Sequence, residues 1–221
     1  MTSTTATPRG FFGVLVRRPS LWFMVIGSVA ALIAGSIITR SRQGSSHTEE
    51  LAVLSKVPPF ELTDQHGAAF GSKDLDGQVW VANFVFTRCP TICPTFTAKM
   101  AAIQKRSPEG LKLVSFTVDP EYDTPEKLDA YAKQYSASER WSFLTGERPV
   151  LTKLVVEGMM QPMDVPTDPT NLALLVHGSY FVLVDQQRRA RGFYKFDEPE
   201  SVEQVLKDAA TLLGTDASRT R

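Results

Sequence analysis

The chain has 221 residues, of which 43% are hydrophobic and 22% charged, a composition typical of a globular domain and not of a disordered chain. Its formal net charge of zero combines two unlike parts: residues 1–48 carry five arginines and no acidic side chain, whereas the rest of the chain has an excess of five acidic side chains. An acidic main part argues against nucleic-acid binding, because phosphates require a basic surface. Two cysteines are also too few for a disulfide-rich scaffold or a four-cysteine zinc or iron–sulfur site.

Residues 21–38 form an uncharged apolar run, LWFMVIGSVAALIAGSII. A helix needs about 20 apolar residues to cross a bilayer, and Trp22 near its start suits the membrane interface. A buried core helix, the alternative, is usually amphipathic, and the apolar region of a signal peptide is usually shorter. The run therefore predicts a transmembrane anchor between a short N-terminus, residues 1–20, and a polar tether, residues 39–50.

The basic flanks of the predicted anchor suggest its orientation. Three arginines precede the apolar run and two follow it closely. Because the more basic flank stays in the cytoplasm, we expect a single-pass protein of the bacterial inner membrane with its main domain in the periplasm. The arginine-rich, acid-free start is also typical of a mitochondrial presequence. The alternative location is therefore the mitochondrial inner membrane, with the domain facing the intermembrane space.

Short β-rich runs alternate with helical stretches over residues 51–214. A nearly continuous apolar run predicts a central strand covered on both faces at 79–86, and further strands are predicted at 111–118, 180–184 and 191–196, the last two joined by a turn at 185–189. Helices are predicted through 97–105, from Thr124 as N-cap to Tyr135, over 149–157 up to Gly158, and from Asp197 and Pro199 to about Leu213. Strands separated by helices predict one α/β domain with a mixed central sheet flanked by helices, followed by a polar tail, residues 215–221.

Both cysteines lie in one short segment, Cys89-Pro90-Thr91-Ile92-Cys93, directly after the predicted strand at 79–86. α/β sheets bind ligands at the carboxyl ends of their strands, and if this segment is helical, residues i and i+4 project from one face. A helix N-terminus or a neighbouring cation such as Arg88 lowers the pKa of a thiol. We therefore expect a reactive pair here, and not two inert buried cysteines.

The spacing of the cysteines leaves a metal site and a redox pair open. Dithiol oxidoreductases usually separate their cysteines by two residues, whereas three separate them here. Soft thiolates select Cu(I), zinc or iron–sulfur clusters, and imidazole suits copper and zinc. His177, directly before the predicted strand at 180–184, is a candidate third ligand, whereas His47 lies in the tether and His66 in a predicted turn.

Three stretches resemble the SCO/SenC family, in this order from residue 57 to the C-terminus: VPPFELTDQHG…VWVANFVFTRCPTICP, SFTVDPEYDTPEKLDAYA and HGSYFVLVD…RGFY. Proteins of that family are membrane-anchored, thioredoxin-like copper proteins associated with assembly of the binuclear copper centre of cytochrome c oxidase. The resemblance implies a thioredoxin-like three-layer fold and copper, as Cu(I) or Cu(II), bound by Cys89, Cys93 and His177. It also implies a partner, the copper-bearing subunit of cytochrome c oxidase or another copper acceptor.

Other residues near the cysteines are candidates for a supporting role. Asp119 and Asp123 resemble the acidic pair of the family and, with Arg88, are candidates for orienting the site or docking a partner. The structural interpretation is that Asp119 ends a strand and that Asp123 precedes a helix start. The sequence departs from the family at Val176, where many relatives have an acidic residue, and over 159–174.

The stretch 159–174 contains three methionines, Met159, Met160 and Met163. Their thioethers are soft ligands, but clustered methionines more often pack against a core or a partner.

Two functions follow from these patterns. The first is a metallochaperone that holds copper and passes it on by ligand exchange. The second is a membrane-tethered thiol–disulfide oxidoreductase that keeps the cysteines of the copper acceptor reduced. Thioredoxin-type oxidoreductases usually carry a Thr-Pro pair before the late strand, where Val176-His177-Gly178 stands here, and this favours copper. A thioredoxin-like peroxidase is disfavoured, because Ala82 and Phe86 replace the proline and threonine of its motif.

Overall fold

The computed structural model describes Val29, residues 51–163 and residues 179–215. The predicted anchor at 21–38, apart from Val29, lies outside the described residues, as do the tether and His177. In the part of the chain that is described, no helix is both long and apolar enough to cross a membrane. Contacts between residues group Leu51–Arg221 into one unit, which carries both cysteines.

An eight-stranded mixed sheet forms the centre of this unit, with the strand order β1-β8-β7-β4-β5-β6-β2-β3. The strands are β1 (Ser55–Lys56), β2 (Glu61–Asp64), β3 (Ala69–Gly71), β4 (Val79–Val85), β5 (Leu111–Thr117), β6 (Trp141–Thr145), β7 (Tyr180–Val184) and β8 (Arg189–Lys195). β5 is parallel to both β4 and β6, and the other neighbours are antiparallel. The parallel strands β4 and β5 therefore end at the same edge of the sheet, in the register Val85 to Thr117.

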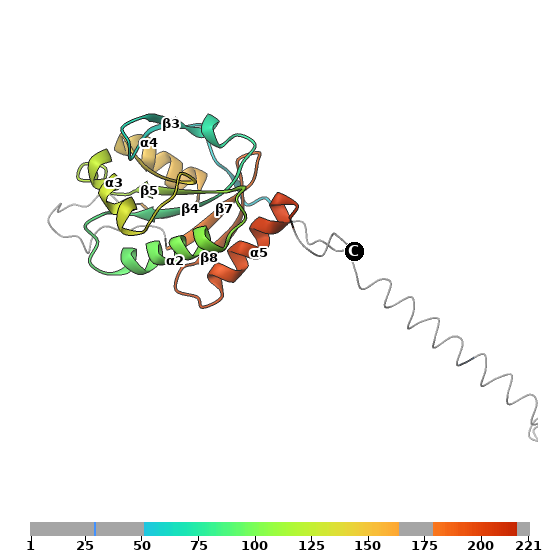
Figure 1. Ribbon diagram of the computed structural model, residues 1–221. Helices are drawn as coiled ribbons and strands as arrows, with labels where there is room; N and C mark the ends of the chain where they lie inside the picture. The colour runs from blue at the N-terminus through green and yellow to red at the C-terminus, as the bar shows by residue number, and fades with distance from the viewer. Residues whose placement is uncertain (1–28, 30–50, 164–178, 216–221) are drawn as a thin grey trace, which may run out of the picture. The chain divides into compact units, whose positions relative to one another are not determined.

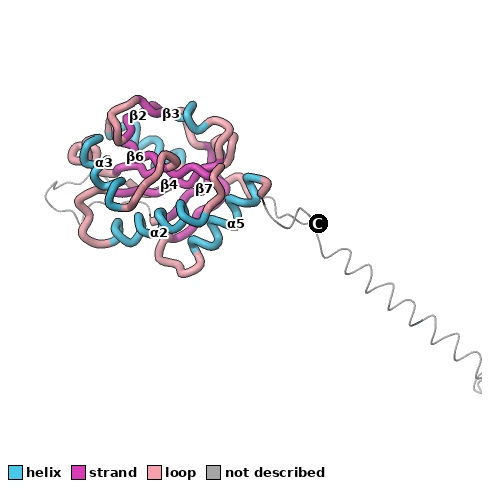
Figure 2. Tube along the Cα trace, in the orientation of Figure 1, coloured by secondary structure: helices cyan, strands magenta, loops and turns pink. Residues whose placement is uncertain are grey.

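Helices cover both faces of the sheet, which gives three layers (Figures 1 and 2). They are the 3₁₀ turn η3 (Ser72–Leu75), α2 (Ile92–Arg106), α3 (Pro125–Gln134), α4 (Arg148–Thr152), the π-helical turn η4 (Lys153–Gly158) and α5 (Ser201–Leu213). Figure 1 shows α2 and α5 on one side of the sheet and α4 on the other. The predicted α/β class with a mixed central sheet is confirmed.

The side chains of the central strand β4 pack into two separate apolar cores. All seven of its residues are buried. Val79 and Val81 pack with α2, α3 and α5, whereas Trp80, Ala82 and Phe84 pack with α4 and η4 on the opposite face. Alternate side chains of a strand point to opposite faces, so a nearly continuous apolar run is what a strand between two helical layers requires.

The four predicted strands correspond to β4, β5, β7 and β8, and the predicted antiparallel pairing of β7 with β8 is confirmed. The helix predicted from Thr124 is α3, which has Thr124 as N-cap and Pro125 in its first turn. The helix predicted over 149–157 consists of α4 and η4 and ends at Gly158. A Cβ at Gly158 would lie 2.5 Å from Cδ of Pro58, so this close approach requires glycine.

Candidate metal centre

The cysteine segment leaves the sheet at the carboxyl end of β4. The N–H of Cys89 donates to the carbonyl of Phe86 at 3.1 Å, which turns the chain directly after the strand. α2 begins only at Ile92, so Cys93 lies in its first turn and Cys89 lies three residues before it. The condition under which both cysteines would share one face of a helix is therefore not met, because Thr87 and Arg88 form a turn, and Pro90 and Thr91 a bend, before the helix begins.

The two sulfurs nevertheless lie together. Both residues are in the thiol form and both are buried, Cys89 with 9% and Cys93 with 0% of its surface exposed. The side-chain hydrogen bond with Cys89 and the burial of the thiol raise the pKa of Cys93 well above its usual range, although a backbone hydrogen bond with Phe86 opposes the shift. The raised pKa keeps Cys93 protonated, and a soft cation that binds both sulfurs would have to displace the thiol protons.

Arg88 does not act as the sequence suggested. Its Nε donates to Oδ2 of Asp119 at 2.7 Å, and its guanidinium lies 4.4 Å from the centre of the Tyr122 ring. The hydrogen bond to Asp119 holds the pKa of Arg88 above its usual range. The expectation that Arg88 and the helix N-terminus lower the pKa of the thiols is wrong for Cys93, because its side-chain hydrogen bond with Cys89 and its burial raise its pKa. The guanidinium of Arg88 is bound to the carboxylate of Asp119.

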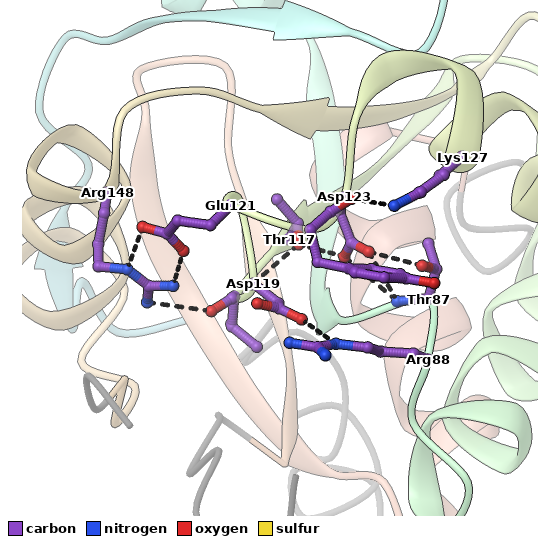
Figure 3. Close-up of polar contacts among 10 residues, drawn as sticks. Thr87, Arg88, Thr117, Asp119, Glu121, Asp123, Lys127 and Arg148 are labelled. Atoms are coloured by element: carbon purple, nitrogen blue, oxygen red, sulfur yellow. Dashed lines mark hydrogen bonds and ion pairs between the residues drawn. The ribbon is translucent and has the colours of Figure 1, made fainter. Parts of the chain in front are cut away.

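Asp123 is fully buried beside the cysteine segment (Figure 3). The hydroxyl of Thr87 donates to its Oδ1 at 2.6 Å, the N–H of Thr87 to its Oδ2 at 3.2 Å, and the hydroxyl of Thr117 to its Oδ2 at 2.5 Å. Burial raises the pKa of Asp123, and the hydrogen bonds from Thr117 and Thr87 oppose that shift. Because all these groups are donors, the arrangement fits a carboxylate.

The other candidate ligands differ in their exposure and contacts. His66 lies in an exposed turn in which Oδ1 of Asp64 accepts its N–H at 2.8 Å, as the sequence predicted. Met159 and Met163 are buried in the core, whereas Met160 is 59% exposed. Among the residues that the structure describes, no three His, Cys, Asp or Glu side chains form a group able to hold a metal ion. His177, the predicted third ligand, lies outside the described residues.

Comparison with known proteins shows to which family the chain belongs. A model of the SCO1/SenC family matches residues 49–214, which include the cysteine segment and both aspartates. The chain belongs to the SCO1/SenC family. An SCO1 protein homolog of Bacillus subtilis is 32% identical over 165 residues, 71% of this chain and 84% of the relative. A protein of Stutzerimonas stutzeri described as a putative copper-binding protein is 37% identical over 102 residues, 44% of this chain and 49% of the relative.

A solved SCO structure has the same fold. BsSco, described as a member of the Sco family of cytochrome c oxidase assembly proteins that has a disulfide switch, is 30% identical. The match covers 72% of this chain and 93% of that chain, with a TM-score of 0.63. The thioredoxin-like fold implied by the resemblance is therefore the fold of solved SCO1/SenC proteins.

Sequence reasoning missed two residues at this site, Thr87 and Thr117. A threonine near a strand end is common because β-branched residues favour strands. Nothing in the pattern therefore indicated that either hydroxyl donates a hydrogen bond to Asp123. The pairing of β4 with β5 brings the two threonines to the same carboxylate.

Proposed function

We propose that this SCO1/SenC protein binds copper through Cys89, Cys93 and His177 and delivers it to a membrane copper enzyme, the binuclear copper centre of cytochrome c oxidase. The observation that carries the proposal is the buried pair of thiols, joined by a side-chain hydrogen bond, at the carboxyl end of the central strand. Two thiolates are soft ligands that suit Cu(I), and an added imidazole also suits Cu(II). Support for copper and for oxidase assembly comes from the descriptions of the Stutzerimonas relative and of BsSco.

Binding and release follow from the chemistry of the pair. Thiols bind metal as thiolates, so copper displaces the proton of each thiol, and binding needs both sulfurs reduced. A thiolate or imidazole of the acceptor then exchanges with one ligand at a time. The burial of both cysteines keeps water away from the sulfurs. The apolar run at 21–38 would hold the protein at the membrane beside its acceptor, with the domain on the periplasmic side.

A copper titration of the full-length, reduced protein tests the proposal. We expect about one copper per chain, as Cu(I) or Cu(II), for a site of two thiolates and one imidazole. The His177→Ala variant should keep Cu(I) on the two sulfurs but lose the wild-type absorption and paramagnetic resonance spectra of Cu(II). A wild-type protein that takes up no copper would contradict the function, and an unchanged Cu(II) spectrum in the variant would contradict the role of His177.

A thiol–disulfide oxidoreductase is the second candidate, favoured by the contact between the two thiols and by the disulfide switch described for BsSco. Exchange requires a thiolate that a partner disulfide can reach, and the 9% exposure of Cys89 limits access for a partner disulfide and for a copper acceptor alike. The reduction potential of the pair separates the two functions. A potential that permits exchange with partner dithiols, combined with weak copper binding, would support the oxidoreductase.

A further inference from the structure

A closed ring of hydrogen bonds joins the cysteine segment to the loop after β5 (Figure 3). The two residues directly before the segment, Thr87 and Arg88, bind the two aspartates of that loop: Thr87 binds Asp123, and Arg88 binds Asp119. The hydroxyl of Thr117 closes the ring, because it donates to Oδ2 of Asp123 at 2.5 Å and accepts the N–H of Asp119 at 3.0 Å. All three ring members on the β5 side are buried.

Thr117 is suited to hold this ring to the sheet. It is the last residue of β5 and pairs in register with Val85, the last residue of β4. Its side chain is 0% exposed, so the hydroxyl has a fixed environment and both of its hydrogen bonds are made inside the protein. A buried hydrogen bond has a defined geometry and is costly to break.

We propose that Thr117 is a positioning residue of the copper site, which fixes Thr87 and Arg88 through the two aspartates and thereby holds Cys89 against Cys93. Cys89 directly follows this pair of residues and precedes α2, so helical hydrogen bonds do not fix it. The main-chain hydrogen bond to Phe86 and the ring both restrain this stretch from the side of the sheet, and Sγ of Cys89 also lies 3.6 Å from the hydroxyl oxygen of Thr91.

The alternative is that the ring only stabilises the domain. The two roles differ in what the removal of the Thr117 hydroxyl changes. If the ring only stabilises the domain, removal of the hydroxyl lowers the free energy of unfolding and leaves the affinity of the folded protein for copper unchanged. If Thr117 positions the site, removal of the hydroxyl weakens copper binding by about 10-fold or more while the protein stays folded, as loss of outer-shell hydrogen bonds typically does at metal sites.

The chain offers a matched set of variants. Thr117→Val keeps the shape of the side chain and removes the hydroxyl, and Thr117→Ser restores the hydroxyl. Ser115→Ala is the control, since Ser115 lies two residues earlier in β5 and its buried hydroxyl binds Asn83 and Trp141, outside the ring. Thr87→Val removes a second hydroxyl of the ring at a half-buried position, in case Thr117→Val does not fold.

The inference rests on the proposed copper site, and two measurements on the full-length protein separate their failures. Cu(I) affinity is measured by competition with a chromogenic chelator, and the equilibrium between the dithiol and the disulfide of Cys89 and Cys93 is measured in thiol buffers without copper. Circular dichroism shows which variants are folded.

We expect Thr117→Val to bind Cu(I) about 10-fold more weakly and to form the disulfide less readily, with Thr117→Ser and Ser115→Ala close to wild type. Wild-type affinity in folded Thr117→Val, or an equal loss in Ser115→Ala, would overturn the inference. If Thr117→Val does not fold, the same loss is expected in Thr87→Val, and its absence there would overturn the inference. If the wild type binds no copper, the proposed function fails, and the disulfide equilibrium alone then decides between the two roles of Thr117.

Discussion

We expect that replacing Cys89 by serine greatly weakens copper binding. A serine hydroxyl is a hard, neutral group that stays protonated, so Cu(I) would lose one of the two soft ligands it prefers. We expect the affinity to fall by more than about 100-fold, the upper end of what the loss of an outer-shell partner costs. Equilibrium competition with a Cu(I) chelator measures the loss, on protein kept reduced throughout.

A control for this variant comes from the methionines. Met159 is fully buried and packs in the same apolar core as the two cysteines. Met159→Leu keeps the volume of the side chain and removes the thioether sulfur, so its copper affinity should stay at the wild-type value. Retention of tight binding in Cys89→Ser, or its loss in Met159→Leu, would show that the ligands are not the ones proposed.

Asp185→Asn should lower the free energy of unfolding of the domain by about 3–5 kcal/mol, as the loss of one partner of a buried ion pair does. Asp185 is 1% exposed, and its Oδ2 accepts hydrogen bonds at 2.7 Å from Nε of Arg189 and from Nη1 of Arg191. Arg191 is also buried, and its Nε donates to the carbonyl of Leu51 at 2.8 Å. An amide at position 185 leaves the guanidinium of Arg191 buried without a counter-charge.

The pH dependence of stability checks the same ion pair. Burial alone would raise the pKa of Asp185, but the hydrogen bonds from Arg189 and Arg191 outweigh it and hold the pKa below its usual range. A lowered pKa means that the carboxylate stabilises the fold above the unfolded pKa, about 3.9, and that this contribution is lost as the pH falls below it. Urea unfolding should therefore show a gap between wild type and Asp185→Asn that is constant near neutral pH and narrows below about pH 4.

A surface ion pair is the matched control for that experiment. Asp197 binds Nζ of Lys195 at 3.1 Å with half of its side chain exposed. Pairs of this kind contribute about 0–1 kcal/mol, so Asp197→Asn should unfold almost as wild type does. An equal effect in both variants would mean that the burial of Asp185 adds nothing to the stability of the domain.

The sequence predicted the parts of the fold that have a clear local signal. The apolar run of β4 and the start of α3, with Thr124 as N-cap and Pro125 in the first turn, are such signals, and both were found within a residue or two. β6 was missed although β7, which also has five residues, was predicted, because WSFLT mixes polar and apolar residues whereas YFVLV is a continuous apolar run. β1, β2 and β3 were missed because they have only two to four residues.

The sequence predicted the two cysteines of the site but not the hydrogen bonds around them. Two cysteines after a buried strand are a local pattern. The ring through Thr87 and Thr117 depends on the parallel pairing of β4 and β5, which joins residues 32 positions apart and which no local pattern reports. The behaviour of Arg88 was mispredicted for the same reason, because its partner Asp119 lies on the neighbouring strand end.

X-ray absorption spectroscopy of the reduced protein loaded with Cu(I) tests the copper site most directly, because it identifies the atoms bound to the metal. The account predicts a first shell of two sulfurs and one imidazole nitrogen in the wild type, and a shell that has lost one sulfur in the weakly loaded Cys89→Ser variant. A wild-type shell without sulfur, or one unchanged in Cys89→Ser, would contradict copper binding by this pair of cysteines.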